Sequence, residues 1–275
     1  MQFRLGAKVY EGDRPLVMGI LNITPDSFYG GSRFPDTNSA VNTVYDMVES
    51  GADIIDIGGE SSRPGAEQIS EDEELSRVIP VIEAISGSIS VPVSIDTYKS
   101  KVAEAALKAG ASVVNDISAL RFDPDMVNII EFSGASVVLM HMQGTPGTMQ
   151  KNPYYGNVIE EILDFLKKRV DFAVSKGILQ DRIIVDPGIG FGKLIEHNLS
   201  ILRQIKRFHE TGCAILVGAS RKSLIGAVTG APVEERLWGT AAITAHCVVQ
   251  GVEIHRVHDI KAIRQVCDVA AAIRG

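Results

Sequence analysis

Short runs of β-branched and other apolar residues recur along the whole chain, and each run ends in a polar or glycine-rich cluster. Amphipathic stretches follow the runs, with apolar residues spaced as on one face of a helix. The runs predict strands at residues 16–21, 53–57, 91–95, 112–115, 136–140, 183–186, 214–218 and 252–257. The stretches between them predict helices, mainly at 39–50, 69–85, 99–108, 158–176, 196–210, 234–250 and 259–272, with a brief helix near 123–132.

The predicted strands are apolar on both faces, which is typical of a parallel sheet covered by helices. Eight strand-then-helix units in 275 residues predict a closed (β/α)8 TIM barrel, and a doubly wound open sheet is the alternative. No linker or low-complexity stretch interrupts the chain, so we expect a single domain over residues 1–275. Phe3, Leu5 and Val9, around Gly6, predict a short N-terminal hairpin that caps the bottom of the barrel.

The composition is that of a soluble globular protein, with 45% hydrophobic and 22% charged residues and a net charge of −7. This acidic balance, without a basic block, argues against nucleic acid as a partner. No window reaches the roughly 18 uncharged apolar residues of a membrane helix, and the first residues lack the apolar run of a signal peptide. We therefore expect no membrane partner and a cytoplasmic location. Cys213, Cys247 and Cys267 are too scattered for a disulfide framework and are predicted to be buried free thiols.

Polar residues gather at the carboxyl ends of the predicted strands, where a TIM barrel builds its active site. Any one of them is accounted for as the N-cap of the next helix, but the full set predicts a lined pocket. The set is Asn22, Asp56 to Glu60, Asp96, Asn115, Asp116, Met140, His141, Asp186, Ser220, Arg221, Lys222, Arg256, His258 and Asp259.

The alternation of side chains along each strand divides this set, because every second residue faces the same side of the sheet. Asp116 and His255 are predicted to face away from the barrel mouth, and we interpret both as structural or surface residues. The residues predicted to face into the mouth are Asp96, Asn115, Asp186, Arg256 and His258.

Three of the inward residues are hydrogen-bond acceptors set in an apolar frame, and their carboxylates would be poorly solvated without a ligand. A flat ligand edge rich in N–H donors, such as a 2-aminopyrimidinone, fits this demand, while Lys222 bonds an exocyclic oxygen or a ring nitrogen. A purely structural hydrogen-bond network under the loops is the alternative. The acceptors are Asp96, Asn115 and Asp186, and the frame is Ile117, Met140 and Phe191.

A second group is cationic. Arg63, Arg256 and His258, with Asn22 nearby, follow predicted strands that are neighbours in a closed barrel. Arginine supplies forked donors to anionic oxygens, and the helix that begins near Asp259 presents free N–H groups. The group therefore predicts a phosphorylated or pyrophosphorylated ligand, with the amide oxygen of Asn22 able to reach a bridging Mg²⁺.

Three loops carry glycines. Residues 22–31 and 58–65 form long, polar, turn-rich loops that we interpret as lids. Residues 186–193 lack both the Walker spacing and the dinucleotide fingerprint, so they predict a tight turn that lets the backbone and Phe191 approach a ligand.

Taken together, the motifs at the predicted strand ends, from the loop that begins at Asn22 to the residues Arg256 to Asp259, resemble the dihydropteroate synthase family over nearly the whole chain. The resemblance implies a barrel that condenses 6-hydroxymethyl-7,8-dihydropterin diphosphate with 4-aminobenzoate and releases diphosphate. It also implies Mg²⁺ as cofactor and a homodimer, for which the helix over 239–247 is a candidate packing face. The motifs include Asn22-Ile-Thr-Pro-Asp26, Gly58-Gly-Glu-Ser-Ser-Arg63-Pro-Gly65, Asp186-Pro-Gly-Ile-Gly-Phe-Gly-Lys193, Ser220-Arg-Lys222 and Arg256-Val-His-Asp259.

The resemblance also implies roles for individual residues. It assigns the pterin to Asp96, Asn115, Asp186 and Lys222, within the frame of Ile117, Met140 and Phe191. It assigns the diphosphate to Ser62, Arg63, Arg256 and His258, and Mg²⁺ to Asn22. It places the aminobenzoate near Phe28, Pro64, Phe191 and Ser220. Catalysis is expected to rest on Asn22, Arg63, Lys222, Arg256 and His258.

The chain departs from the family pattern at two positions. Ser62 stands where many members have threonine, which keeps the hydroxyl. Tyr29-Gly30-Gly31 stands where many have an acidic residue, so a role for that acid does not carry over. Three other functions stay open at this point: a pterin-dependent methyltransferase, which has no use for the cationic group, a Schiff-base aldolase using Lys222, and a pterin-binding module without activity.

Overall fold

The computed structural model describes residues 1–12, 14–23, 37–61, 65 and 67–275. Within them, parallel strands close into a barrel in the order β10-β3-β4-β5-β6-β7-β8-β9. The closed order confirms the predicted TIM barrel and excludes the open sheet. The barrel strands are β3 (Leu16–Asn22), β4 (Ile54–Gly58), β5 (Val93–Asp96), β6 (Val113–Asp116), β7 (Ser136–Met140), β8 (Ile183–Asp186), β9 (Ala214–Val217) and β10 (Ile254–Val257).

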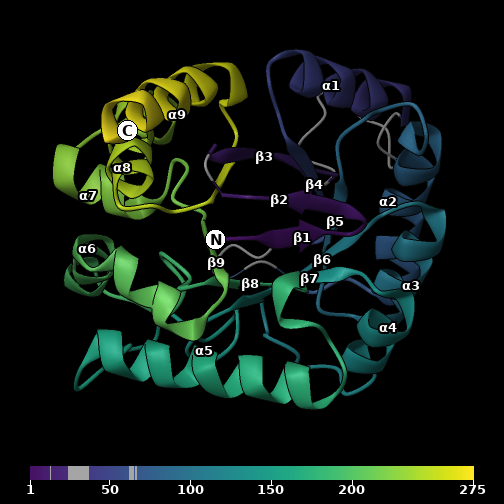
Figure 1. Cartoon of the computed structure of the whole chain (residues 1–275), viewed down its shortest axis with the longest axis horizontal. Helices are drawn as coiled ribbons and strands as arrows, with labels where there is room; N and C mark the ends of the chain where they lie inside the picture. Colours follow the sequence, from purple (N-terminus) through teal and green to yellow (C-terminus); the bar gives the residue numbers. More distant parts are fainter. Residues whose placement is uncertain (13, 24–36, 62–64, 66) are drawn as a thin grey trace.

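Helices surround the strands as an outer ring (Figure 1). Ser70 caps α2, since its hydroxyl accepts the N–H of Glu73 at 3.1 Å, and an acidic first turn complements the helix dipole. The predicted helix over 196–210 is divided at Gln204 into an α-helix and a 3₁₀ segment. The α-helices are α1 (Thr37–Glu49), α2 (Glu71–Ile85), α3 (Ser100–Ala109), α4 (Met126–Ser133), α5 (Val158–Ser175), α6 (Ile195–Arg203), α7 (Ser223–Thr229), α8 (Leu237–Val249) and α9 (Ile260–Arg274), and the 3₁₀ segments are η1 (Gln180–Arg182), η2 (Ile205–Thr211) and η3 (Val233–Glu235).

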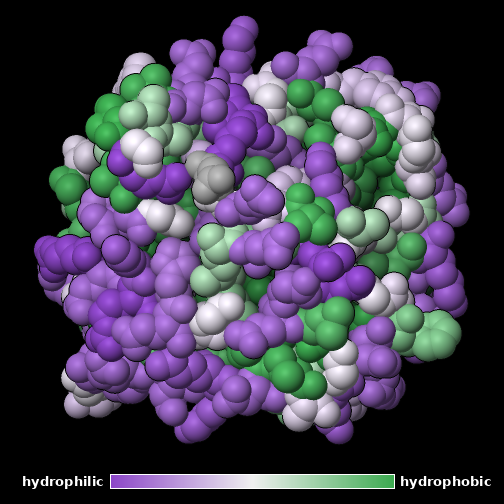
Figure 2. Space-filling model, in the orientation of Figure 1, coloured by the Kyte–Doolittle hydropathy of each residue, from purple (hydrophilic) through white to green (hydrophobic). Residues whose placement is uncertain are grey.

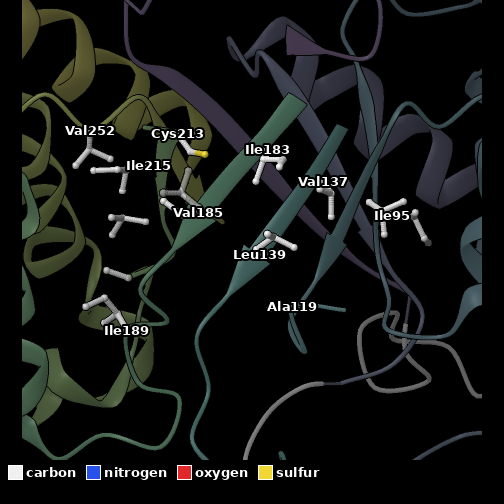
Figure 3. Close-up of a cluster of buried hydrophobic side chains, with 14 of the residues drawn as sticks. Ile95, Ala119, Val137, Leu139, Ile183, Val185, Ile189, Cys213, Ile215 and Val252 are labelled. Carbon is white, nitrogen blue, oxygen red and sulfur yellow. The ribbon is translucent and has the colours of Figure 1, made fainter. Parts of the chain in front are cut away.

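The two faces of each strand are buried in different places. Side chains such as Ile95, Val137 and Val185 belong to a large cluster with apolar residues of the helices, part of which is drawn in Figure 3. The intervening positions, such as Val113 and Ile184, belong to a separate cluster inside the barrel. The predicted alternation is therefore confirmed, and it decides which polar residues reach the barrel mouth.

A hairpin of β1 (Phe3–Leu5) and β2 (Lys8–Tyr10) closes the bottom of the barrel. Phe3 and Leu5 are buried in the interior cluster, and a Cβ on Gly6 would lie 2.6 Å from Cβ of Ser112. Val9, which we expected to take part in the cap, is 43% exposed and lies outside it. It pairs with Arg4, so alternation places it on the opposite face of the hairpin from Phe3 and Leu5. Because the hairpin closes this end, a ligand would enter at the opposite end of the barrel.

The outer surface is mixed in character. On the face drawn in Figure 2, hydrophilic side chains cover most of the area and apolar ones lie in small groups between them. No helix among the described residues is long and apolar enough to cross a membrane. Cys213, Cys247 and Cys267 are buried free thiols, as predicted.

Candidate active site

The carboxyl ends of the strands bring the predicted acceptors to one level of the barrel. Asp96 pairs in register with Asn115, and Asp186 pairs with Met140. Asn115 and Asp186 are buried, and the Asp96 side chain is 11% exposed. The structure thus brings together three polar side chains that are up to 90 residues apart in sequence.

Arg256 crosses the barrel from β10 to this group. Its Nε donates to Oδ2 of Asp56 at 2.5 Å, and one of its terminal nitrogens donates to Oδ2 of Asp96 at 2.7 Å. The amide nitrogen of Asn115 donates to the same Oδ2 of Asp56 at 3.1 Å. Arg256, which we grouped with the cations of a diphosphate site, therefore also touches the acceptor group.

Asp56 is a site residue that sequence reasoning did not select. We noted it only as the start of a polar stretch, yet its carboxylate bonds two predicted site residues and is fully buried. The alternation of side chains could have identified Asp56, since Asp56 and Gly58 occupy in β4 the positions that Ser94 and Asp96 occupy in β5. A polar residue one step below a strand end belongs to the same face of the sheet.

The carboxylates of the site hold protons more tightly than exposed carboxylates do. Burial raises the pKa of Asp96 to about 7, against the lowering effect of Arg256 and with a further increase from Asp56. Burial also raises the pKa of Asp186, whereas Lys222 and the N–H of Gly188, which donates to Oδ1 at 2.7 Å, act in the opposite direction. A ligand that donates N–H hydrogen bonds would stabilise the ionised form of both carboxyl groups.

Lys222 lies beside Asp186 at the base of α7. Its Nζ donates to the carbonyl oxygen of Ile189 and lies 4.3 Å from the ring centroid of Phe191. Burial lowers the pKa of Lys222 to about 8, against the opposing effect of Asp186. The lysine therefore joins the acceptor group to the glycine-bearing loop that follows β8.

That loop is a tight turn, as predicted. Gly188, Gly190 and Gly192 all have positive φ, and a Cβ on Gly188 would lie 2.0 Å from the carbonyl oxygen of His141. Only glycine tolerates both the left-handed backbone and this close approach. The loop brings Phe191 to an apolar cluster over the barrel mouth, which contains Ile117, Met140, Met142, Met149, Tyr98, Phe122 and Phe191.

Lys193 ends this loop as a buried amine. Its Nζ donates to the carbonyl oxygens of Phe191 at 2.9 Å and His141 at 3.2 Å, and lies 3.0 Å from Nδ1 of His141. Sequence reasoning gave Lys193 no role, because a lysine beside glycines ordinarily marks a solvated loop. Here it fastens the loop to the end of β7.

The loops after β9 and β10 are tied together at the other side of the mouth. Nδ1 of His258 lies 2.9 Å from the hydroxyl of Ser220, and the backbone N–H of His258 donates to the same oxygen at 3.2 Å. Arg221 bonds the carboxylate of Asp259 with two nitrogens, at 2.9 and 2.6 Å. Ser220 therefore contacts His258, which we predicted as a diphosphate ligand, although the resemblance placed Ser220 near the aminobenzoate.

Asn22 ends β3 in register with Gly58 of β4, which has no side chain. A Cβ on Gly58 would lie 3.7 Å from the amide oxygen of Asn22 and 3.5 Å from Cβ of Asp96, so the absence of a side chain there keeps a space between the two. No cluster of three or more His, Cys, Asp or Glu that could hold a metal occurs among the described residues. A magnesium ion here would therefore need most of its ligands from diphosphate oxygens and water, which is how Mg²⁺ is commonly bound.

Four predicted residues lie outside the described residues: Phe28, Ser62, Arg63 and Pro64. The described base of the second loop is anchored by Glu60, which accepts bonds from the hydroxyl of Tyr98 and from Nζ of Lys99, both at 2.6 Å. This anchor fixes where that loop leaves β4.

The two residues that we interpreted as structural or surface residues are both buried. Asp116 accepts the backbone N–H groups of Ser118 and Leu120, both at 2.7 Å, and is fully buried. His255 is 1% exposed and faces away from the barrel interior. Alternation along a strand thus separated these residues from those of the mouth.

Comparisons with known proteins show the family to which the chain belongs. The sequence profile of the family described as pterin binding enzyme matches residues 18–258. A dihydropteroate synthase of Synechocystis is 46% identical over 263 residues, which cover 95% of this chain and 91% of that protein. The crystal structure of the Yersinia pestis dihydropteroate synthase with a sulfonamide drug has a TM-score of 0.94 at 39% identity, and covers 100% of this chain and 99% of that one. The Xanthomonas albilineans dihydropteroate synthase with 4-aminobenzoic acid has a TM-score of 0.92 at 39% identity, and covers 100% and 98%.

The chain belongs to the pterin-binding enzyme family, and its identity to relatives over nearly their full length places it among the dihydropteroate synthases. This confirms the resemblance drawn from the strand-end strings. It also sets aside the methyltransferase and the Schiff-base aldolase.

Proposed function

We propose that this chain condenses 6-hydroxymethyl-7,8-dihydropterin diphosphate with 4-aminobenzoate to give 7,8-dihydropteroate and diphosphate. The observation that carries the proposal is the group of acceptors formed by Asn115 and Asp186, which are buried, and Asp96, which is nearly so, beside the half-buried Lys222. These groups match the donor and acceptor pattern of a pterin edge. The membership of the chain among the dihydropteroate synthases supports the same conclusion.

The pterin end of the substrate would bind deepest. The carboxylates of Asp96 and Asp186 and the amide oxygen of Asn115 accept its N–H groups, and Lys222 donates to its carbonyl oxygen or a ring nitrogen. Ile117, Met140 and Phe191 belong to one apolar cluster that would cover the flat ring. A site built to pair every polar atom of its ligand rejects analogues that lack them.

The diphosphate end would lie toward His258 and Arg256. Nη1 of Arg256 makes no hydrogen bond within the described part of the chain, since Nε and the other terminal nitrogen are taken by Asp56 and Asp96. It is therefore the nitrogen left for an anionic oxygen. Ser62 and Arg63 complete the proposed set of diphosphate ligands, on the basis of the family motif they share.

Magnesium would be held at Asn22 together with the diphosphate. When bound, the ion neutralises charge on the leaving group. The space kept open by Gly58 beside the Asn22 amide is the observation that supports this site.

The reaction needs no strong general base. The bond between the methylene carbon and its oxygen breaks with its electron pair going to diphosphate, and the electron-rich dihydropterin delocalises the cation that remains. Arg63, Arg256 and His258 stabilise the developing negative charge. The lone pair of the arylamine then forms the new carbon–nitrogen bond, and the amine releases its proton to solvent or to diphosphate. Phe28, Pro64, Phe191 and Ser220 are the proposed walls of the aminobenzoate site.

A homodimer and a cytoplasmic location complete the proposal. Thr240, Thr244 and Cys247 of α8 face the core of their own chain, so the face left for a partner is the opposite one, on which Trp238 is 80% and Val249 46% exposed. Exposed apolar side chains on one helix face favour a partner subunit. The three buried free thiols are typical of a reducing compartment.

Release of diphosphate tests the proposed activity. Purified protein with Mg²⁺ is expected to release diphosphate from the pterin ester only when 4-aminobenzoate is present as well. Tight binding of the pterin ester without release in the presence of both substrates would instead identify a pterin-binding module without activity.

A further inference from the structure

Asp56 occupies a layer of the barrel below the proposed ligand. It is fully buried, and it lies in register with Ser94 of β5, one step beneath Gly58 and Asp96. A carboxylate at such a depth is costly unless its oxygens are paired. The contacts that Asp56 makes therefore indicate why a charged residue stands there.

One oxygen of Asp56 makes all of these contacts. Oδ2 accepts Nε of Arg256 at 2.5 Å and the amide nitrogen of Asn115 at 3.1 Å, whereas Oδ1 has no hydrogen-bond partner among the residues that the structure describes. An Asp that served the barrel alone would be expected to pair both oxygens with the backbone, as Asp116 does through Ser118 and Leu120. Asp56 instead contacts the side chains of two proposed ligand-binding residues.

The contact with Arg256 fixes the plane of the guanidinium group. The fork of an arginine is rigid, so holding Nε on Asp56 and one terminal nitrogen on Asp96 determines the direction of the third nitrogen. That third nitrogen is the one proposed to meet the diphosphate. Without Asp56, the guanidinium would keep its charge but lose this orientation.

The contact with Asn115 decides which end of the amide remains for the ligand. A carboxylate only accepts hydrogen bonds, so Asp56 must take the nitrogen of Asn115 and leave the oxygen. The pterin is proposed to need an acceptor at this position. Asp56 therefore sets the polarity of Asn115 without touching the substrate.

We infer that Asp56 is a positioning residue of this enzyme, which acts through Arg256 and Asn115 to prepare the site for the pterin diphosphate. The inference rests on the proposed function and adds to it a residue that lies beneath the ligand. Its consequence is coupling, because the effect of changing Asp56 depends on the presence of Arg256.

A double-mutant cycle measures this coupling. Asp56→Asn is expected to weaken the binding of the pterin diphosphate by about tenfold. In the Arg256→Met background the same change is expected to weaken binding by only about two- to threefold, because the orientation of Arg256 has already been lost and only the contact of Asp56 with Asn115 remains. Ser94→Ala serves as the matched control, because Ser94 lies in the same layer and its hydroxyl bonds no other residue in the described part of the chain. Its effect should be the same in both backgrounds.

Equal losses from Asp56→Asn in the two backgrounds would show that Asp56 serves the barrel alone and would overturn the inference. Urea unfolding of each variant checks that the proteins are folded. If Asp56→Asn does not fold, Asp56→Glu takes its place in the cycle, since it keeps the charge but displaces the oxygen, and the same coupling is expected. The cycle is read in calorimetric binding, so it remains informative if the wild type fails to release diphosphate, a failure that would contradict only the proposed function.

Discussion

Nζ of Lys193 lies 3.0 Å from Nδ1 of His141 and 3.2 Å from the carbonyl oxygen of the same residue. Both residues are buried, and burial lowers the pKa of each well below its ordinary value. The pair fastens the end of β7 to the loop that carries Phe191. It therefore supports the apolar side of the proposed pterin site from behind.

Lys193→Met is expected to lower the free energy of unfolding by about 1 to 3 kcal/mol, because the carbonyl oxygens of His141 and Phe191 lose their donor. Urea denaturation measures the change. Lys151→Met, on an exposed lysine, is the matched control and should leave stability within about 0.5 kcal/mol of the wild type. Similar stability of the two variants would remove Lys193 from this role.

Asp186→Asn should cost about 2 to 4 kcal/mol of pterin affinity, because the amide places a donor opposite the N–H donors of the ligand. Asp164→Asn, on an exposed carboxylate of α5, controls for the loss of one negative charge. Titration calorimetry with hydroxymethyl dihydropterin measures both. Unchanged affinity in Asp186→Asn would exclude this residue from the pterin site.

Pterin affinity should rise as the pH increases through about 7. Burial raises the pKa of Asp96 from 3.8 to about 7, and the ligand needs the ionised carboxylate. Calorimetry at pH values on either side of 7 measures the change. Asp96→Asn should bind more weakly and lose the part of this pH dependence that Asp96 causes. Equal wild-type affinity on both sides of pH 7 would contradict the prediction.

Loss of the Asp96 proton should lower the stability of the folded protein, although it should raise the affinity for the pterin. The folded protein holds the Asp96 proton more tightly than the unfolded chain, so this contribution to stability is complete below about pH 4 and is lost as the pH rises toward 7. Asp96→Asn, which has no proton to lose, should therefore be more stable than the wild type at about pH 8 and gain less at about pH 4. Thermal unfolding at the two pH values compares them. A variant that is less stable at both would show that the carboxylate itself supports the fold.

His258→Ala should weaken binding of the pterin diphosphate while leaving binding of the unphosphorylated pterin within about twofold. Arg256→Ala should weaken the binding of both ligands, because Arg256 also contacts Asp96 of the proposed pterin site. The loss should be larger for the pterin diphosphate. Calorimetry with the two ligands measures the four affinities. Equal losses of affinity for the two ligands in His258→Ala would show that His258 acts on folding or on the pterin and not on the diphosphate.

Most of the barrel and the acceptor group could be predicted from sequence because alternation along a strand is a local property. Asp96 and Asp186 could be selected, and Asp116 and His255 set aside, from their neighbours alone. The contact between Arg256 and Asp56 could not, since these residues are 200 positions apart and meet only when the barrel closes. Lys193 was missed for a related reason, because its burial depends on a glycine loop folding back onto β7.

The central part of the proposed function is that the acceptors at the barrel mouth bind the pterin during turnover. The decisive measurement compares dihydropteroate formation from both substrates in the wild type, Asp96→Asn and Asp186→Asn under the same conditions at about pH 8, which lies above the pKa of Asp96. We expect one dihydropteroate for each diphosphate released by the wild type, and a loss of about 30-fold or more in kcat/KM in each variant. Wild-type kcat/KM in both variants would contradict this expectation.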